Sequence, residues 1–250
     1  MKSSVLIGLL STVFTPAIVT SAFAATLSVH CPQGCPTNPD NNDLVFTHIY
    51  ALSNNPETKF ADWVAYEVNP INFGASPGRT WKSDPLLEQD ETLEKADYSG
   101  ASSTSLQADR GHQAPLASFA GSRFWYEANY LSNITPQDKD LNQGPWKQLE
   151  EKVRNAATYD SPLYVITGPV FDEKMPSLPK ADENHTVPSG YFKVIYDGKH
   201  SIGFLMAQNV KRSENACSKI VKLEEIQTQL SFTLPKLPFD TELQEKLGCW

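Results

Sequence analysis

The stretch Asp109-Arg110-Gly111-His112-Gln113-Ala114-Pro115 brings a carboxylate, a guanidinium and an imidazole into four residues, together with a glycine that allows tight backbone geometry. Further along the chain lie two asparagine-rich runs, Asn133-Ile134-Thr135-Pro136-Gln137 and Asp140-Leu141-Asn142-Gln143-Gly144. This density of polar, chemically versatile residues within about 35 positions predicts that the segment holds a reactive site and that the rest of the fold supports it.

A helix is expected directly after these runs, over residues 146–157. Trp146, Leu149 and Val153 repeat on one face of it, as an amphipathic helix requires. Glu150 and Arg154 are then i, i+4 neighbours that project together from the helix.

These residue types suit the hydrolysis of a phosphodiester. A neutral histidine such as His112 can deprotonate water near pH 7, and arginines or Mg²⁺ can offset charge on the phosphorus centre. Mg²⁺ prefers oxygen ligands and keeps several waters, so the amide oxygen of Asn142 can suffice as its protein ligand. The sequence contains no phosphate-binding P-loop.

Outward from this segment, the pattern predicts an α+β fold with a mostly antiparallel β-sheet core and flanking helices. Residues 25–43 read as an irregular arm, and residues 70–105 as a long connection with several turn signals. A short helix is expected at 223–230. Strands are expected at 45–52, 60–68, 163–170, 191–196 and 202–208, with the first two paired as a hairpin.

The alternation within residues 60–68 predicts which side chains share a face of the sheet. Trp63, Ala65 and Glu67 should point one way. Val64, Tyr66 and Val68 should point the other way.

Composition bounds the class of protein. The chain has 250 residues, 40% of them hydrophobic, and a formal net charge of −8. It can bury a core, and its acidic balance argues against a histone-like coat for nucleic acid. A local basic site is still compatible with this sum.

Residues 1–24 resemble a secretory leader, with a positive Lys2, an apolar stretch, and the small-x-small pattern Ala22-Phe23-Ala24 before the expected cleavage site. The alternative is a membrane anchor, which the short stretch broken by Pro16 disfavours. We therefore expect residues 25–250 to form a single domain that is secreted or periplasmic, with no membrane contact after the leader is cleaved.

Four cysteines, Cys31, Cys35, Cys217 and Cys249, allow three pairings. A local Cys31–Cys35 bridge would leave Cys217 to pair with Cys249. The alternative, a four-cysteine zinc site, fits the spacing poorly, and an oxidising compartment favours disulfides.

On these residues the chain resembles the Serratia-type sugar-non-specific DNA/RNA nucleases, which are ββα-metal or His-Me finger enzymes. The resemblance covers nearly the whole mature chain. It is carried by residues 59–66, 81–85, 109–118, 129–137, 140–144 and 167–169 and by the four cysteines.

The resemblance implies a secreted, Mg²⁺-dependent endonuclease (Mn²⁺ can substitute) with a ββα-metal finger, acting on single- and double-stranded DNA and RNA and leaving 5′-phosphates. By this resemblance His112 is the general base, Asn142 is the only direct protein ligand of Mg²⁺, and Glu150 orients metal-bound water. Arg79 and Arg110 contact the phosphate, and Arg154 helps on the side of the leaving group. Asn133 holds either the His112 environment or the scissile phosphate in register. Asp109 is expected to be a structural partner and not a metal ligand. Relatives include dimers, so a homodimer is compatible with this interpretation.

Two alternatives stay open at this stage. One is a catalytically weak nucleic-acid-binding or toxin-like module, which would be expected to lack the histidine or the asparagine ligand. The other is a phosphodiesterase for small nucleotides, against which a long basic groove would count. Asn133-Ile134-Thr135 also matches a glycosylation sequon, and His30, His48, His185 and His200 lack any motif and are expected to be structural or surface residues.

Overall fold

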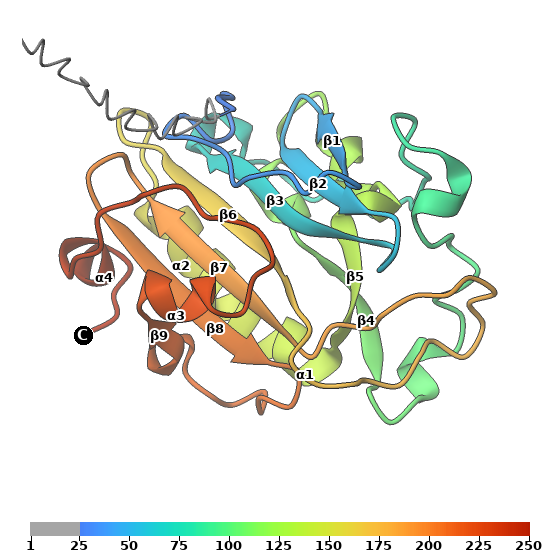
Figure 1. Ribbon diagram of the computed structural model, residues 1–250. Coiled ribbons are helices and arrows are strands. Elements are labelled where there is room, and N and C mark those ends of the chain that lie inside the picture. Colours follow the sequence, from blue (N-terminus) through green and yellow to red (C-terminus); the bar gives the residue numbers. More distant parts are fainter. Residues whose placement is uncertain (1–25) are drawn as a thin grey trace, which may run out of the picture.

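The computed structural model describes residues 26–250, so the predicted leader at residues 1–24 lies outside the described residues. Its main sheet is antiparallel throughout, in the spatial order β1-β2-β3-β6-β7-β8-β9 (Figure 1). The strands are β1 Asp43–Phe46, β2 Ala51–Asn55, β3 Phe60–Val68, β6 Leu163–Val170, β7 Gly190–Tyr196, β8 Ser201–Ala207 and β9 Ile220–Val221. The predicted α+β class with a mostly antiparallel sheet is confirmed.

A second, two-stranded sheet pairs β4 (Ala108–His112) with β5 (Ile134–Asp138). A helical segment follows β5 without a break. It consists of α1 (Lys139–Leu141), a π-helical turn (Asn142–Trp146) and α2 (Lys147–Ala156). Two short helices near the C-terminus are α3 (Leu223–Gln227) and α4 (Glu242–Lys246).

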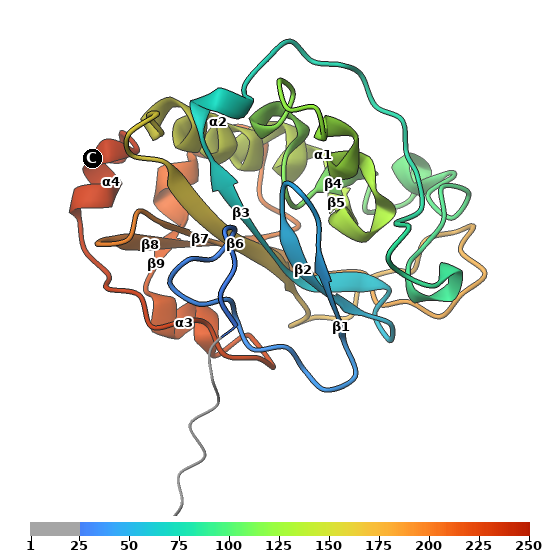
Figure 2. The ribbon, with the colours of Figure 1, turned by 90° about the horizontal axis from the view of Figure 1, so that it is seen from above.

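The main sheet separates two layers (Figure 2). On one side lie α1, α2 and the β4–β5 hairpin; on the other lie α3 and the N-terminal arm. Strands such as β7, which is buried along its whole length, are therefore covered on both faces.

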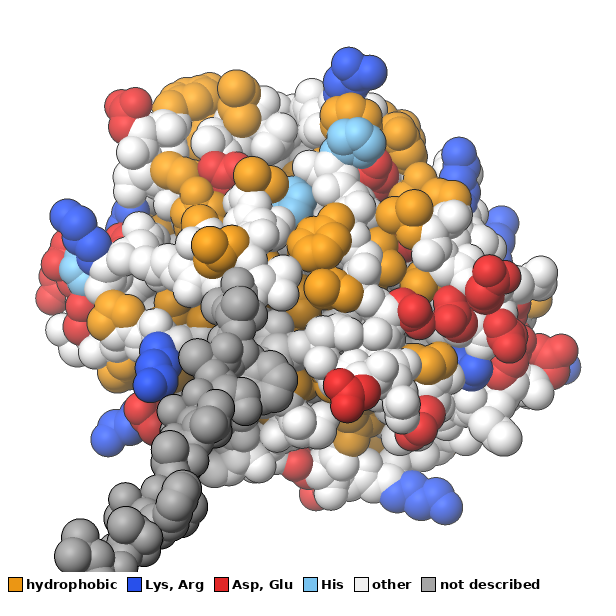
Figure 3. Space-filling model, turned by 45° about the horizontal axis from the view of Figure 1, so that its top comes forward, with side chains coloured by type: hydrophobic (Ala, Val, Ile, Leu, Met, Phe, Trp, Pro, Cys, Tyr) orange, Lys and Arg blue, Asp and Glu red, His pale blue; other side chains and the backbone are white. Residues whose placement is uncertain are grey.

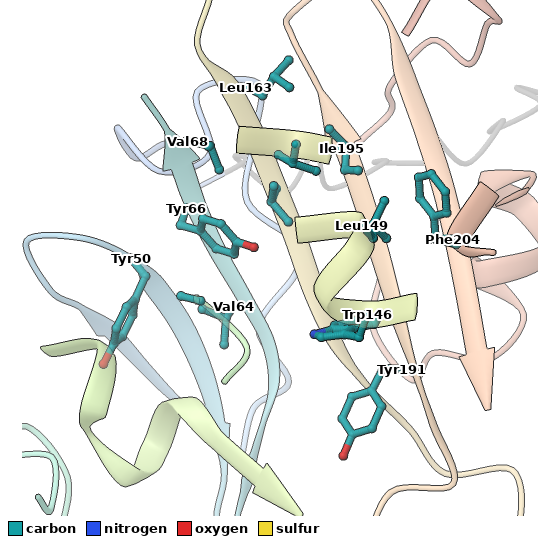
Figure 4. Packing of buried hydrophobic residues seen from close by; sticks show 14 of the residues in the cluster. Tyr50, Val64, Tyr66, Val68, Trp146, Leu149, Leu163, Tyr191, Ile195 and Phe204 are labelled. Atoms are coloured by element: carbon teal, nitrogen blue, oxygen red, sulfur yellow. The ribbon is translucent and has the colours of Figure 1, made fainter. Parts of the chain in front are cut away.

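Helix α2 packs on the sheet through the face predicted from its periodicity. Trp146, Leu149 and Val153 are buried in a core cluster with side chains of the sheet such as Val64 and Tyr66 (Figure 4). Truncating a buried tryptophan of this kind to alanine costs about 3–5 kcal/mol. The other face of the sheet holds a second cluster, which includes Trp63 and Ala65 of β3 together with Leu223 and Ile226 of α3. The alternation predicted for residues 63–66 and 68 is thus confirmed.

One strand prediction is wrong. Residues 45–52 do not form one strand, because the chain turns between β1 and β2 and pairs them with each other. The Thr47 hydroxyl accepts hydrogen bonds from the N–H groups of Ile49 (3.3 Å) and Tyr50 (3.1 Å). This local side-chain bonding competes with an extended strand, and it leaves β2, not the predicted longer strand, paired with β3.

The remaining expected elements begin and end within a few residues of their predicted bounds, α3 ending at Gln227 and not at residue 230. The long connection at residues 70–105 contains three short 3₁₀ segments. It is anchored by its own cluster of buried residues, which includes Leu93, Tyr98 and Ala101. Among the described residues, no helix has the length and apolar character needed to cross a membrane.

Two disulfides join Cys31 to Cys35 and Cys217 to Cys249. The pairing expected from the sequence is confirmed, and the zinc alternative is excluded because all four sulfurs are used. The second bridge lies close to α2, whose Lys152 donates hydrogen bonds to the carbonyl oxygens of Leu247 and Gly248.

Candidate active site

The β4–β5 hairpin and α2 place the predicted reactive residues around one cavity of about 640 Å³. Arg110 and His112 are two residues apart in β4 and therefore project from the same face. Gly111 lies between them because a side chain there would collide with Gln137 of β5: a Cβ atom would come within 2.5 Å of Gln137 Oε1. The glycine of the sequence motif thus serves a close approach between two strands.

His112 is held by an asparagine that the sequence analysis did not assign a role. His112 Nε2 lies 3.0 Å from Asn129 Oδ1, and Asn129 is fully buried. Because Oδ1 accepts this hydrogen bond, Nε2 carries the proton and Nδ1 is the ring nitrogen free to act as a base. Burial lowers the pKa of His112 to about 4, the Asn129 bond opposes this, and the charge of Arg79 lowers it further. The imidazole is therefore neutral at pH 7, the form that a general base requires.

Asn142 lies in the π-helical turn just before α2, where its amide is oriented by Asp109. Asn142 Nδ2 donates to Asp109 Oδ2 at 2.9 Å, and Gln143 Nε2 donates to the same oxygen at 2.7 Å. Within residues 26–250 the Oδ1 atom of Asn142 makes no hydrogen bond, and Asn142 lines the cavity. Asp109 therefore fixes which atom of Asn142 is available to a ligand.

Glu150 and Arg154 both line the cavity from α2. Burial raises the pKa of Glu150 to about 7, while the charges of Lys193 and Arg154 lower it. Lys193 is a fully buried lysine on β7 whose Nζ lies 4.3 Å from the centre of the Trp146 ring. Sequence reasoning missed it, because its strand reads as apolar.

The arginine of the motif, Arg110, is fixed before any substrate binds. Its guanidinium lies 5.6 Å from the Trp81 ring centre and 5.3 Å from that of Tyr98, and Nη2 donates to the Lys95 carbonyl at 3.1 Å. Arg110 Nε and Arg154 Nη1 are buried donors with no partner within the described chain. Such donors suit the oxygens of a phosphate.

The cavity is positively charged although the chain is acidic. Its lining includes five basic side chains, Arg79, Arg110, Lys147, Arg154 and Arg212. Only two acidic side chains, Asp109 and Glu150, accompany them. The cavity is therefore suited to an anion.

Asn133 does not reach this cavity. It is fully buried; its Oδ1 accepts from the N–H of Ala114, and its Nδ2 donates to the carbonyls of Ala114 and Ala128. A direct contact with the scissile phosphate, one of the two roles predicted for Asn133, is incompatible with this burial. The other role agrees with the geometry, since Asn133 fixes the backbone directly after His112 and that of Ala128, next to Asn129.

Outside the cavity lining, one acidic group has metal-like spacing within residues 26–250. It is formed by Glu94, Asp97, Asp182 and Glu183, whose carboxylate atoms lie within 4.8 Å of one another. Burial, together with Glu183 and Asp97, raises the pKa of Glu94 to about 7. The cluster joins two loops at the edge of the molecule.

A β-hairpin that presents a neutral histidine, followed by a helix that presents an amide and a carboxylate to the same basic cavity, defines the ββα class of phosphodiester hydrolases. The family model described as DNA/RNA non-specific endonuclease matches residues 28–239, and the chain belongs to this family. It is therefore an endonuclease of DNA and RNA, and a divalent metal ion is the cofactor typical of its family.

Individual relatives agree. The chain is 40% identical over 237 residues to a nuclease of Serratia marcescens, covering 88% of this chain and 89% of that protein. It is 30% identical over 158 residues to the human mitochondrial endonuclease G, covering 58% of this chain and 52% of that protein. The fold is similar to that of a chain in the crystal structure of the EndoG/EndoGI complex, with a TM-score of 0.67 and 20% identity, over 81% of this chain and 88% of that one.

Proposed function

We propose that this protein is a secreted, Mg²⁺-dependent endonuclease that cleaves single- and double-stranded DNA and RNA and leaves 5′-phosphates. The observation that carries the proposal is the convergence of His112, Asn142 and Glu150 in one basic cavity, where Arg110 Nε and Arg154 Nη1 have no partner in the described chain. The two disulfides support export, because such bridges persist in oxidising compartments. We likewise propose a leader at residues 1–24 and a single nuclease domain over residues 25–250.

His112 acts as the general base in this proposal. Its Nδ1 accepts the proton of the attacking water, while the Asn129 bond holds the ring and its tautomer in place. Since the imidazole is neutral at pH 7, it is ready for this step without prior deprotonation.

The residues around Asn142 fit a hard cation. The free atom of Asn142 is an amide oxygen, its amide nitrogen is held by Asp109, and the carboxylate of Glu150 lines the same cavity. Oxygen donors of this kind are the ligands that Mg²⁺ prefers, with Mn²⁺ as a substitute. When bound, the ion supplies positive charge to the phosphate oxygens and the leaving oxygen.

The other side chains bind and orient. Arg79 and Arg110 contact the phosphate, Arg154 stabilises charge on the leaving side, and Glu150 orients water. Asn133 supports this arrangement from the core, because its side chain holds the backbone at Ala114, two residues after His112, and at Ala128, next to Asn129. Contacts of this type read phosphate and not bases, which supports tolerance of both sugars and of either strandedness.

A digestion assay tests the proposal. Purified protein should cleave plasmid DNA and RNA in Mg²⁺, stop when a chelator is added, and produce ends that a 5′-phosphate-dependent exonuclease accepts. His112→Ala should lower kcat by about 10²–10⁴-fold, the usual contribution of a general base, with an unchanged melting temperature. Full activity of that variant, or cleavage restricted to small nucleotide diesters, would refute the proposed mechanism or substrate class.

A further inference from the structure

A basic side chain that the sequence analysis did not single out reaches the active-site cavity from the loop after β8. Arg212 is exposed and lines the cavity, and its Nη2 donates to Gln143 Oε1 at 2.9 Å. Gln143 follows Asn142 in the chain and is itself bound to Asp109. One continuous set of hydrogen bonds thus links Arg212 to the residue proposed to hold the metal ion.

The loop that carries Arg212 is fixed against the start of α2. Gly144 has backbone angles outside the helical range (φ −107°, ψ −116°). A Cβ atom there would lie 2.6 Å from the Arg212 carbonyl oxygen and 2.7 Å from its Cα. The glycine therefore permits a direct backbone approach, which sets the position of the arginine relative to Asn142.

Within the loop, the backbone closes a turn around Arg212. The N–H of Glu214 donates to the Lys211 carbonyl, and the Glu214 carboxylate accepts from the N–H of Lys211, both at 2.9 Å. Arg212 is thereby presented from an ordered turn.

The Arg212 guanidinium has donors to spare. An arginine carries five N–H groups in a planar fork that matches phosphate, and in the described chain the bond to Gln143 is the one hydrogen bond formed by this side chain. The mechanism proposed above already uses Arg79, Arg110 and Arg154 at the scissile phosphate. Arg212 contacts Gln143, the chain neighbour of Asn142, so it reaches the cavity on the Asn142 side.

We propose that Arg212 binds the phosphate of a nucleotide next to the cleaved bond, on the Asn142 side of the cavity. Phosphates of one strand follow each other about every 3.4 Å along the axis of a duplex, so a cavity that holds the scissile group brings a neighbour close. This inference rests on the proposed function, because it assigns a further contact to the same substrate. It predicts that Arg212 matters for polymers and matters less for a substrate with a single phosphodiester.

Two variants of adjacent residues and two substrates test the inference. Arg212→Ala is compared with Lys211→Ala, which removes the same charge from the same loop but from a side chain that does not line the cavity. The substrates are a single-stranded oligonucleotide and bis(p-nitrophenyl) phosphate, a diester without a flanking phosphate. We expect Arg212→Ala to lose about tenfold more in kcat/KM on the oligonucleotide than on the small diester, mainly through KM, as for loss of a charge-assisted hydrogen bond. Lys211→Ala should match the wild type on both.

The salt dependence of KM gives an independent readout. For Arg212→Ala the slope of log KM against log salt on the single strand should fall by about 0.7, the value for one released counterion. Equal losses on both substrates would mean that Arg212 only supports Gln143, and equal losses in both variants would mean a general charge effect; either result overturns the inference. A wild-type protein that cleaves neither substrate would instead refute the proposed function.

Discussion

A buried amide holds the ring of His112, the proposed general base. Asn129 is fully buried, and its Nδ2 has no partner in the described chain, so its one side-chain hydrogen bond is the contact with His112. Sequence reasoning pointed to Asn133 instead, because both asparagines lie in the same short run. Which of the two faces His112 depends on the 3₁₀ turns at Trp125–Asn129 and Leu131–Asn133, which no periodicity in the sequence predicts.

Asn129→Ala should therefore impair catalysis through geometry. We expect kcat to fall by about 10–100-fold, as for a misplaced catalytic group. The Asn129 bond raises the pKa of His112, so its loss should lower that pKa and move the acid limb of the kcat/KM profile to lower pH. Measuring pH–rate profiles of both proteins checks the direction; a profile that moves to higher pH, or a kcat within twofold of the wild type, would contradict this role.

At the scale of elements, regular patterns were predictable and local competition was not. The alternation in β3 and the apolar face of α2 could be read from residues such as Trp63, Tyr66 and Leu149, because burial repeats with the period of each element. The turn between β1 and β2 was missed because Thr47 satisfies its neighbours' N–H groups, an effect of one side chain. Strand β4 could not be recognised from its pattern either, because it carries the polar residues of the active site.

The loops joined by the acidic cluster should respond to pH. Glu94 has a pKa near 4.5 when unfolded and about 7 in the folded protein. Between these values the folded state binds more protons, so the stability falls as pH rises from about 4.5 to 7 and stays at the lower level above that. Glu94→Gln removes the repulsion with Asp97 and Glu183 and should raise Tm by about 2 °C at pH 8, but not at pH 4.

Thermal melts across pH, with Glu57→Gln as the control, test this prediction. Glu57 is exposed and lies outside the cluster, so its replacement removes the same charge without relieving this repulsion. An equal gain in both variants, or no gain at pH 8, would show that the cluster does not limit stability.

At the scale of the whole molecule, a formal net charge of −8 coexists with a basic cavity. The acidic side chains gather elsewhere, many of them on the side that carries the long connection between β3 and β4 (Figure 3). The sum of charges could be read from the sequence, but their separation could not. It requires the long connection between β3 and β4, α2 and the loop after β8 to bring distant basic residues such as Arg79, Arg154 and Arg212 to one place.

This separation predicts how affinity depends on salt. Only the cations around the cavity should displace counterions, and Lys147 is already paired with Glu151 at 3.6 Å. For His112→Ala bound to duplex DNA in Mg²⁺, about four phosphate contacts give a slope of log K against log salt near −3.6, at about −0.9 for each contact. Fluorescence anisotropy at several salt concentrations measures this slope. A slope steeper than about −7 would require a second basic surface outside the cavity, because the cavity lining alone offers too few cations to release so many ions.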